Sequence, residues 1–262
     1  MKKILLGLFF VTTSCNQTFG MGSIKKLIHM QHEATMGFLE MSKDNNVTVK
    51  FKEISEESYP KATVYFENMK AKYPQALDGV SIVIANVTGP MSSSLVIMFP
   101  KAWIDELEAE VVLGKSTQVQ NIIEWTLLHE AGHIKKQHIS KLLIATTATS
   151  AVVAYTVYKA ECFKDYSPAQ RFFIKYGIYV VAFHLLNFAE KTAYSRYVME
   201  PEADDFANEF CDNLQALDAA AEWLDRATVD VINYPTKASR IGKIKQALLK
   251  RFGTPELVTA QA

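Results

Sequence analysis

The amino-acid sequence predicts an α+β fold that is mainly helical, and three observations support this. Apolar residues recur at the spacing of an amphipathic helix over most of the chain. Two short apolar runs, 80–87 and 94–99, are typical of β-strands. Two longer runs, 142–158 and 172–189, carry one lysine and no other charge, and they predict a hydrophobic helical hairpin. With 262 residues the chain can form one large domain or two small ones.

Charge and cysteine content exclude some classes of protein. The 28 basic and 28 acidic residues balance, and the basic residues form no stripe interleaved with aromatic ones, so we expect no nucleic-acid partner. Cys15, Cys162 and Cys211 are too few and too scattered for a disulfide framework or a thiolate zinc site. Any metal-binding or catalytic site must therefore use residue types other than cysteine.

Residues 1–20 resemble a leader segment. Two lysines precede the apolar run 4–11, which is too short to span a bilayer. Small residues after this run fit two cleavage sites, and Cys15 could carry a lipid, although Thr12 stands where a bacterial lipobox usually has leucine. A signal peptide, a lipoprotein leader and an uncleaved anchor all remain open, and each implies export or membrane contact.

Short elements are expected between the leader and residue 117. They are a helix over residues 24–43, a half-buried strand over 47–54, a helix from Pro60 that Pro74 ends, the two strand-like runs, and a helix over 103–112. The two strand-like runs should form a β-hairpin, because Gly89 and Pro90 lie in the turn-rich stretch that separates them.

A well-specified amphipathic helix should begin after Thr117. Thr117 and Gln120 form a capping box, and apolar residues then recur at helical spacing up to Ile134. The second half of this helix contains His-Glu-Ala-Gly-His at positions 129–133, which is an H-E-x-x-H pattern.

The H-E-x-x-H pattern predicts a zinc site. His129 and His133 are four residues apart, so they project from one helix face and can bind the same Zn²⁺. Glu130 lies beside them and can take a proton from the attacking water as a general base. The alternative is a surface helix with two unconnected histidines. The metzincin arrangement is excluded because Ile139 stands ten residues after His129, and His138 is expected to be solvated.

A catalytic zinc ion needs a third protein ligand, and the best source is the segment 195–207. Pro201 suits a first helical turn, and Glu200 and Asp204 are four residues apart on one face. Glu200 would complete the zinc site, while Asp204 would accept the free ring N–H of a ligand histidine. The alternative is an acidic, solvated helix start that the helix dipole stabilises. Residues 204–226 should continue as one long helix, followed by a basic helix over 240–252.

The hydrophobic hairpin allows two interpretations. Each run is close to the lower length limit for a transmembrane helix, so the pair could span a membrane. Alternatively, it could be a soluble pair that packs on the rest of the protein or rests on a membrane surface. Basic residues gather at the end joined to the motif helices, which favours a cytoplasmic orientation of that end, whereas the leader favours export. The orientation stays open.

Three motifs together resemble one family. The H-E-A-G-H element, the hairpin and the E-P-E-A-D element at 200–204 are similar to those of HtpX and CAAX prenyl endopeptidase type zinc metallopeptidases, which are gluzincins of metallopeptidase family 48. Residues 234–241 also resemble the H-P-P-x-x-x-R-I element of that family, although Tyr234 replaces its histidine. A further difference is the gap of three residues between Arg196 and Glu200, where the family usually has a shorter one.

The resemblance implies a zincin-like core in which the hairpin is inserted between the zinc-binding elements. It places the third zinc ligand at Glu200 and the accompanying aspartate at Asp204, with one Zn²⁺ per chain. Tyr234 and Arg240 could stabilise an oxyanion or bind substrate. The second strand-like run, 94–99, is the one we expect to form the sheet edge that pairs with an extended substrate; the alternative is a strand that only packs on the helix.

The implied domain organisation follows from these motifs. It comprises a leader or anchor at 1–20, the N-terminal part of a catalytic domain at 21–141, the hairpin at 142–189 and the C-terminal part at 190–262.

The resemblance also implies an endopeptidase of the cell envelope, in the bacterial inner membrane or periplasm. Its substrates would be unfolded or membrane-associated polypeptides, as in protein quality control. The alternative is a membrane-associated binding or chaperone-like protein that keeps the fold but has lost turnover. Glu130 favours the enzyme, because a binding protein needs no general base. The sequence predicts neither the cleavage preference nor the oligomeric state.

Overall fold

The computed structural model describes residues 52–54, 57–93, 95–110, 117–161, 163–226 and 234–253. The leader, the helix expected at 24–43 and most of the strand expected at 47–54 lie outside these residues. Among the described residues, 140–190 form one compact unit, and those before and after this stretch form another.

The sheet has four strands in the order β1-β2-β4-β3. These are β1 (Lys52–Glu53), β2 (Ser81–Ala85), β3 (Met91–Ser93) and β4 (Val96–Pro100). β1 is antiparallel to β2, β2 is parallel to β4, and β3 is antiparallel to β4. Ile82 of β2 is in register with Ile97 of β4.

Two expectations about this sheet are wrong. The two strand-like runs do not form a hairpin, because they pair in parallel; the stretch read as a turn forms β3 and makes the hairpin with β4. The second run is also not an edge strand. All five residues of β4 are buried, as suits an inner strand with a neighbour on each side, and the edge is β3.

Three of the four helices described before the hairpin confirm the sequence-based expectations, and the fourth, a helix of four residues that starts at Pro74, was not expected. The four described helices are α3 (Pro60–Lys72), α4 (Pro74–Leu77), α5 (Lys101–Glu110) and α6 (Gln118–Lys135). α3 has a proline in its first turn and ends just before Pro74. At the start of α6 the Thr117 side chain accepts from the backbone N–H of Gln120, whose own side chain accepts from the Thr117 N–H.

The C-terminal helices differ in one respect from the expectation. They are α9 (Glu200–Phe210), α10 (Leu214–Arg226) and α11 (Lys237–Phe252). The single helix expected over 204–226 is broken at 211–213, where Cys211 adopts an extended conformation. The Asn213 side chain accepts a hydrogen bond from the Gln215 N–H, so Asn213 caps the N-terminus of α10. Its amide also donates to the buried Glu124 carboxylate of α6, which fixes the break against the motif helix.

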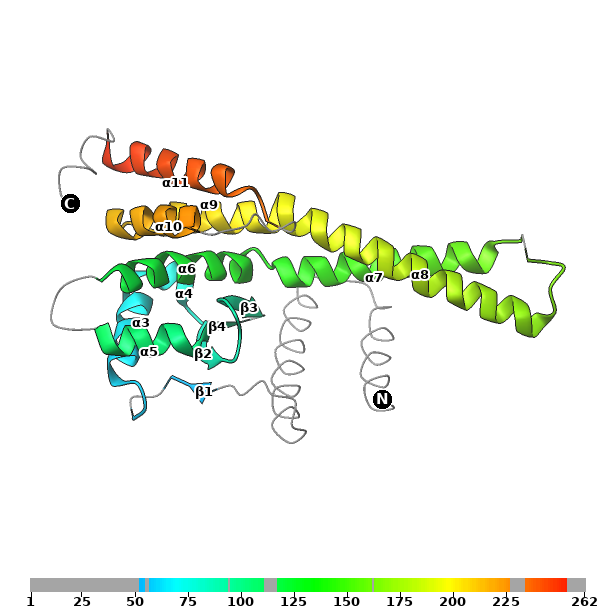
Figure 1. Cartoon of the computed structure of the whole chain (residues 1–262), viewed down its shortest axis with the longest axis horizontal. Coiled ribbons are helices and arrows are strands. Elements are labelled where there is room, and N and C mark those ends of the chain that lie inside the picture. Colours follow the sequence, from blue (N-terminus) through cyan, green and yellow to red (C-terminus); the bar gives the residue numbers. More distant parts are fainter. Residues whose placement is uncertain are drawn as a thin grey trace. The chain divides into compact units, whose positions relative to one another are not determined.

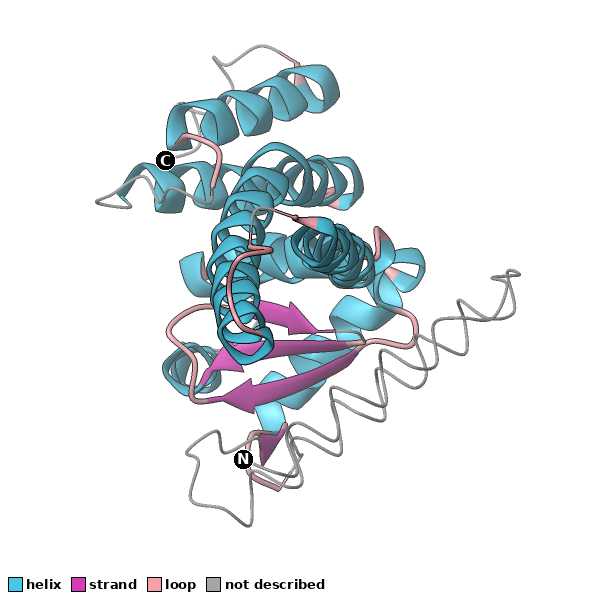
Figure 2. Cartoon of the chain, turned by 90° about the vertical axis from the view of Figure 1, so that its right-hand side faces the viewer, coloured by secondary structure: helices cyan, strands magenta, loops and turns pink. Residues whose placement is uncertain are grey.

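α6 is the central helix of its unit. It contacts β3 and β4 on one side and α9 and α10 on the other, and α11 packs against α9 and α10 (Figure 1). The strands are seen beneath the helical layer in Figure 2. Trp125, Leu127 and Leu128 of α6 are almost completely buried in the core that these elements share. The H-E-x-x-H pattern therefore lies inside the protein, and the interpretation of α6 as a surface helix is wrong.

The hairpin consists of α7 (His138–Lys159) and α8 (Pro168–Tyr194). Both are long and apolar enough to cross a membrane. Within this pair, Ser150 hydrogen-bonds Tyr179, and Thr149 donates to Glu190. Most large apolar side chains are exposed; they include Leu143, Ile144, Val152, Tyr155, Phe172, Phe173, Ile178, Val181, Leu185, Leu186 and Phe188.

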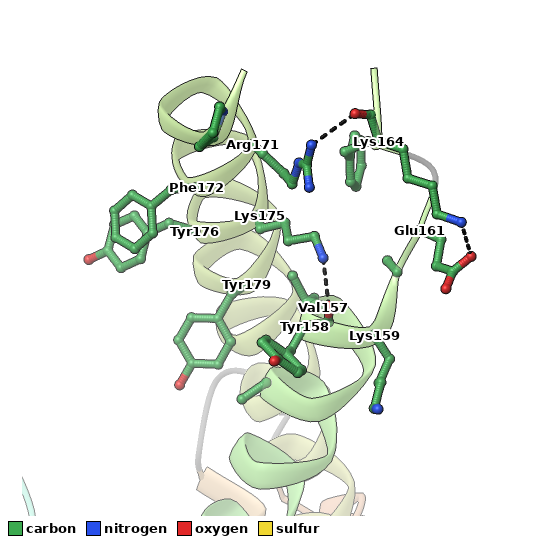
Figure 3. A pocket seen from close by; sticks show the side chains of 14 residues that line it. Val157, Tyr158, Lys159, Glu161, Lys164, Arg171, Phe172, Lys175, Tyr176 and Tyr179 are labelled. Carbon is green, nitrogen blue, oxygen red and sulfur yellow. Dashed lines mark hydrogen bonds and ion pairs between the residues drawn. The ribbon is translucent and has the colours of Figure 1, made fainter. Parts of the chain in front are cut away.

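A cavity of about 640 Å³ lies at the end of the hairpin where the two helices are connected (Figure 3). Lys175 donates to the carbonyl oxygen of Tyr158 at 2.6 Å, and Arg171 donates to the carbonyl oxygens of Lys164 and Tyr166. These cations thus satisfy carbonyl groups that the helix end and the turn leave unpaired. The Lys175 ammonium also lies 5.8 Å from the centre of the Tyr158 ring, and further aromatic residues line the cavity, so this end of the hairpin combines basic and aromatic residues.

α8 runs into α9 through one π-helical turn, Ser195–Met199. α9 then approaches α6 very closely at Gly132. A Cβ atom built on Gly132 would lie 3.0 Å from Cα of Ala203 and 3.0 Å from Cβ of Phe206, both on α9. Only glycine fits there without moving one helix.

We expect Gly132→Ala to lower the free energy of unfolding by about 1 to 3 kcal/mol, because it overpacks this contact. Gly242→Ala is the matched control: it is also a helical glycine, but nothing lies within 4 Å of its added Cβ. This control should be neutral or stabilise the protein by up to about 1 kcal/mol. Chemical unfolding of both variants measures the difference, and equal stability of the two would contradict the close contact.

Candidate metal centre

Two imidazole rings of α6 lie edge to face inside the protein. His129 and His133 are both buried, and their Nε2 atoms lie 3.2 Å apart. Burial, followed by the influence of His129, lowers the pKa of His133 to about 2. The His133 ring is therefore neutral and keeps a lone pair on one of its nitrogens.

Glu200, the first residue of α9, reaches the same point. Its Oε2 lies 3.3 Å from Nε2 of His129, and its Oε1 lies 3.6 Å from Nε2 of His133. Although Glu200 lies 67 positions after His133 in the sequence, the close contact of α9 with α6 brings its carboxylate to the rings.

These three side chains fit a small divalent cation. Four ligands at about 2.0 to 2.1 Å around a tetrahedral zinc ion lie about 3.3 to 3.4 Å from one another. The separations here are 3.2, 3.3 and 3.6 Å. In addition, Oε2 of Glu200 is buried without a hydrogen-bond partner, which is costly unless a cation satisfies it. Two nitrogen donors and one carboxylate are also a donor set that zinc accepts.

Glu130 is the second carboxylate near the rings. Donor atoms of His129, Glu130 and His133 lie within 4.8 Å of one another, so this group could also hold an ion. Glu200 fits well, because its two oxygens lie 3.3 and 3.6 Å from Nε2 of His129 and of His133. Burial raises the pKa of Glu130, and the opposing effects of His129 and of a hydrogen bond from Ser92 in β3 offset this only in part. Glu130 can therefore both hold and release a proton.

Asp204 lies behind His129. Its Oδ1 is 2.9 Å from Nδ1 of His129, close enough to accept the ring proton, although the contact departs from ideal hydrogen-bond geometry. Burial would lower the pKa of His129, but Asp204 and Glu200 outweigh this and raise it to about 10. A cation that binds Nε2 must therefore displace a proton.

Arg240 of α11 holds Asp204 from the other side. Its Nε donates to Oδ2 at 2.8 Å and its Nη2 to Oδ1 at 2.7 Å, so the pair is bidentate and buried. Burial would raise the pKa of Asp204, but His129 and Arg240 lower it to about 2. The guanidinium of Arg240 is thus engaged with Asp204, a contact that the sequence did not reveal.

Tyr234 lies at the mouth of the site. Its ring is 5.6 Å from the Arg240 guanidinium carbon. Burial, and then the carboxylates of Glu200 and Glu130, raise the pKa of Tyr234 to about 12, so its hydroxyl remains a hydrogen-bond donor.

A cavity of about 420 Å³ opens next to the rings. Its wall includes His129, Glu130, Tyr234 and Arg240 together with apolar side chains, among them Pro90, Trp103, Trp125, Trp223, Leu224 and Pro235. It thus combines chemically active groups with a large apolar surface, as ligand sites usually do.

His138 is the residue whose environment was predicted wrongly. It is completely buried rather than solvated, with Nδ1 2.8 Å from Nδ1 of His133 and Nε2 3.0 Å from Oε2 of Glu202. Gln137 has a positive φ of 56°, which turns the chain between α6 and α7 and brings His138 beneath His133. A spacing of five residues does not mark a shared helix face, so periodicity could not reveal this contact.

Comparison with known proteins gives one match. The model of the family described as Peptidase family M48 matches residues 68–248, which is more than two thirds of the chain. The matched region includes every residue of the centre described above. No curated protein and no solved structure matches the chain.

We expect Asp204→Asn to destabilise the metal-free protein by about 3 to 5 kcal/mol, because it leaves the buried Arg240 without its counter-charge. The folded-state pKa of about 2 is below the ordinary value of 3.8. The carboxylate therefore stabilises the fold fully above the ordinary pKa, and this contribution is lost as the pH falls through about 2. The difference in the free energy of unfolding between wild type and Asp204→Asn should therefore become smaller as the pH is lowered from 6, as measured by urea unfolding.

Asp205→Asn provides the control for this variant. Asp205 is the next residue of α9, but it is exposed and pairs with Lys243 at the surface, so its loss should cost less than about 1 kcal/mol. If the Asp204 and Asp205 variants lost equal stability, the buried pair would not have the importance given to it here.

Proposed function

The chain belongs to peptidase family M48, and on this premise we propose that it is a zinc-dependent endopeptidase of polypeptides at or near a membrane. The family indicates a metallopeptidase, and therefore a hydrolase. The observation that carries the proposal is the convergence of His129, His133 and Glu200 within 3.6 Å of one another, beside a buried Glu130.

In this proposal His129 and His133 hold one zinc ion through Nε2, and Glu200 holds it through its carboxylate. Bound there, zinc supplies a Lewis acid that lowers the pKa of water and polarises a carbonyl group. Asp204 accepts a hydrogen bond from Nδ1–H of His129, which keeps the proton on Nδ1 and the lone pair on Nε2. Arg240 keeps Asp204 ionised and in place.

Glu130 performs the proton transfer. Because its pKa is raised, the protonated and ionised forms of the Glu130 side chain are closer in free energy. Glu130 can therefore accept a proton from the attacking water and pass it to the leaving amine. Tyr234 supports this chemistry as a neutral donor beside Glu130, where it can hydrogen-bond the oxygen on which negative charge develops. Arg240 acts mainly through Asp204.

Two features suit a polypeptide substrate. β3 pairs with β4 on one side, and among the described strands it has no partner on the other, so an extended peptide can add to this edge close to α6. The adjoining cavity has three tryptophans in its wall and can take a bulky apolar side chain of that peptide. Apolar side chains of this kind are exposed in unfolded and membrane proteins.

We place the protein in the cell envelope, with α7 and α8 crossing the membrane. Both helices satisfy the length and hydropathy required, and no residue of α8 is buried within the protein. Basic and aromatic side chains at the turn between them suit a membrane interface (Figure 3). The hairpin would hold the catalytic part near substrates at the membrane.

Replacing Glu130 by Gln tests the enzymatic role. We expect the variant to cleave casein with a kcat/KM about 10² to 10⁴ times lower than wild type, because the general base is lost. It should still contain zinc, and a chelator should inactivate the wild type. An inactive wild type, or a Glu130→Gln variant with normal cellular function, would instead favour the binding protein that keeps the fold without turnover.

Charges in the hairpin test the membrane assignment. The wild type should stay in the membrane fraction after alkaline carbonate extraction. Val152→Asp combined with Val181→Asp places carboxylates at exposed apolar positions and should release the protein, since each acidic residue costs about 2.5 to 3.5 kcal/mol at the centre of a membrane. Ala169→Asp, at the start of α8, is the control and should remain bound. If carbonate instead released the wild type from the membrane fraction, the hairpin would be soluble or bound only to the membrane surface.

A further inference from the structure

A chain of three side chains leads from the metal centre to the surface. It runs from His133 on α6 to His138, the first residue of α7, and on to Glu202 on α9. The nitrogen-to-nitrogen contact is 2.8 Å, and the contact between His138 and Glu202 is 3.0 Å. The His138 side chain is completely buried, whereas that of Glu202 is 42% exposed.

The carboxylate of Glu202 determines which nitrogen atoms of His138 and His133 donate and which accept. An ionised carboxylate can only accept, so Glu202 favours a proton on Nε2 of His138. In a neutral imidazole the other nitrogen, Nδ1, then carries a lone pair. That lone pair faces Nδ1 of His133, which must provide the proton of the 2.8 Å hydrogen bond. His133 is left with a lone pair on Nε2.

The free lone pair points where the ion is needed. Nε2 of His133 is the atom that lies 3.2 Å from His129 and 3.6 Å from Glu200. With the opposite order of protons, Nε2 of His133 would carry hydrogen and could not be a ligand, while Nε2 of His138 would turn a lone pair towards a carboxylate. Only the first placement of the protons suits both the carboxylate of Glu202 and a ligand role for His133.

We propose that His138 and Glu202 are positioning residues that hold His133 in the tautomer that binds a metal ion through Nε2. This inference rests on the proposed metal site and adds residues that act on it. Each ligand histidine is then oriented by a carboxylate of α9: Asp204 acts on His129 directly, and Glu202 acts on His133 through an intervening ring. With Glu200, α9 provides one ligand and both orienting carboxylates.

The test measures zinc affinity of the full-length protein in detergent by competition with a chromophoric chelator. His138→Phe keeps a ring but removes both nitrogens, so Nδ1 of His133 loses its acceptor. Loss of such an orienting partner typically weakens metal binding about 10- to 100-fold, and we expect a decrease in this range. His138→Gln retains a donor and an acceptor on one side chain, and it should restore much of the affinity.

The outer carboxylate provides a second test with little risk to folding, because Glu202 is half-exposed. Glu202→Gln should weaken zinc binding, though by less than His138→Phe, since the amide can turn either a donor or an acceptor towards His138. Glu209→Gln makes the same change at an exposed position of α9 and should bind zinc like wild type. The optical spectrum of the cobalt(II) form should change in His138→Phe and remain as wild type in Glu209→Gln.

The outcomes separate this inference from the proposed function. Wild-type zinc affinity in both His138→Phe and Glu202→Gln would overturn the inference alone. If His138→Phe does not fold, Glu202→Gln decides: weaker binding than Glu209→Gln supports the inference, and equal binding overturns it. A wild type that binds no zinc, or a His133→Ala variant that binds it as tightly as wild type, would remove the proposed metal site and the inference with it.

Discussion

The centre depends on the close approach of α9 to α6. Without a Cβ at Gly132, the backbone of Ala203 can lie against α6, where an added methyl group would be only 3.0 Å away. Ala203 stands between Glu202 and Asp204, so this contact determines where Glu200 and Asp204 meet the two histidines of α6 and where Glu202 meets His138. A metal site assembled from two helices far apart in sequence needs such a constraint, because its ligand separations tolerate only small errors.

Buried charge is the cost of this arrangement, and the fold offsets it locally. Glu130, Glu200 and Asp204 are all buried near one another. Arg240 neutralises Asp204 through two hydrogen bonds, and the rings of His129 and His138 each turn a nitrogen that can donate a proton towards a carboxylate, Asp204 and Glu202 respectively. Among the histidines and carboxylates of the centre, Oε2 of Glu200 and Nδ1 of His129 lack a well-formed hydrogen bond, and the carboxylate oxygen is an atom that a cation would satisfy. The electrostatics therefore favour a bound divalent ion over an empty polar core.

Elements that depend on nearby residues could be predicted from the sequence, whereas contacts between residues far apart in the sequence could not. The capping box, the prolines and the apolar periodicity gave α3, α5, α6 and α11 closely, because each depends on neighbours within a few residues. Strand pairing could not be deduced, since β3 has a short polar sequence that looks like a turn. The break after α9 depends on Asn213 reaching Glu124, and the burial of His138 depends on one positive φ at Gln137. None of these contacts leaves a periodic pattern. The M48 family and the place of Asp204 beside a ligand histidine were recognisable from spaced motifs, whereas the contacts of Arg240 with Asp204 and of His138 with His133 were not.

The central claim is that His129, His133 and Glu200 together hold one zinc ion. Its most direct test is the zinc content of the purified wild type and of Glu200→Ala after gel filtration in a weak chelator. The account predicts one zinc per wild-type chain and its loss from the variant, with the helices intact by circular dichroism. Zinc retained by a folded Glu200→Ala variant would contradict it.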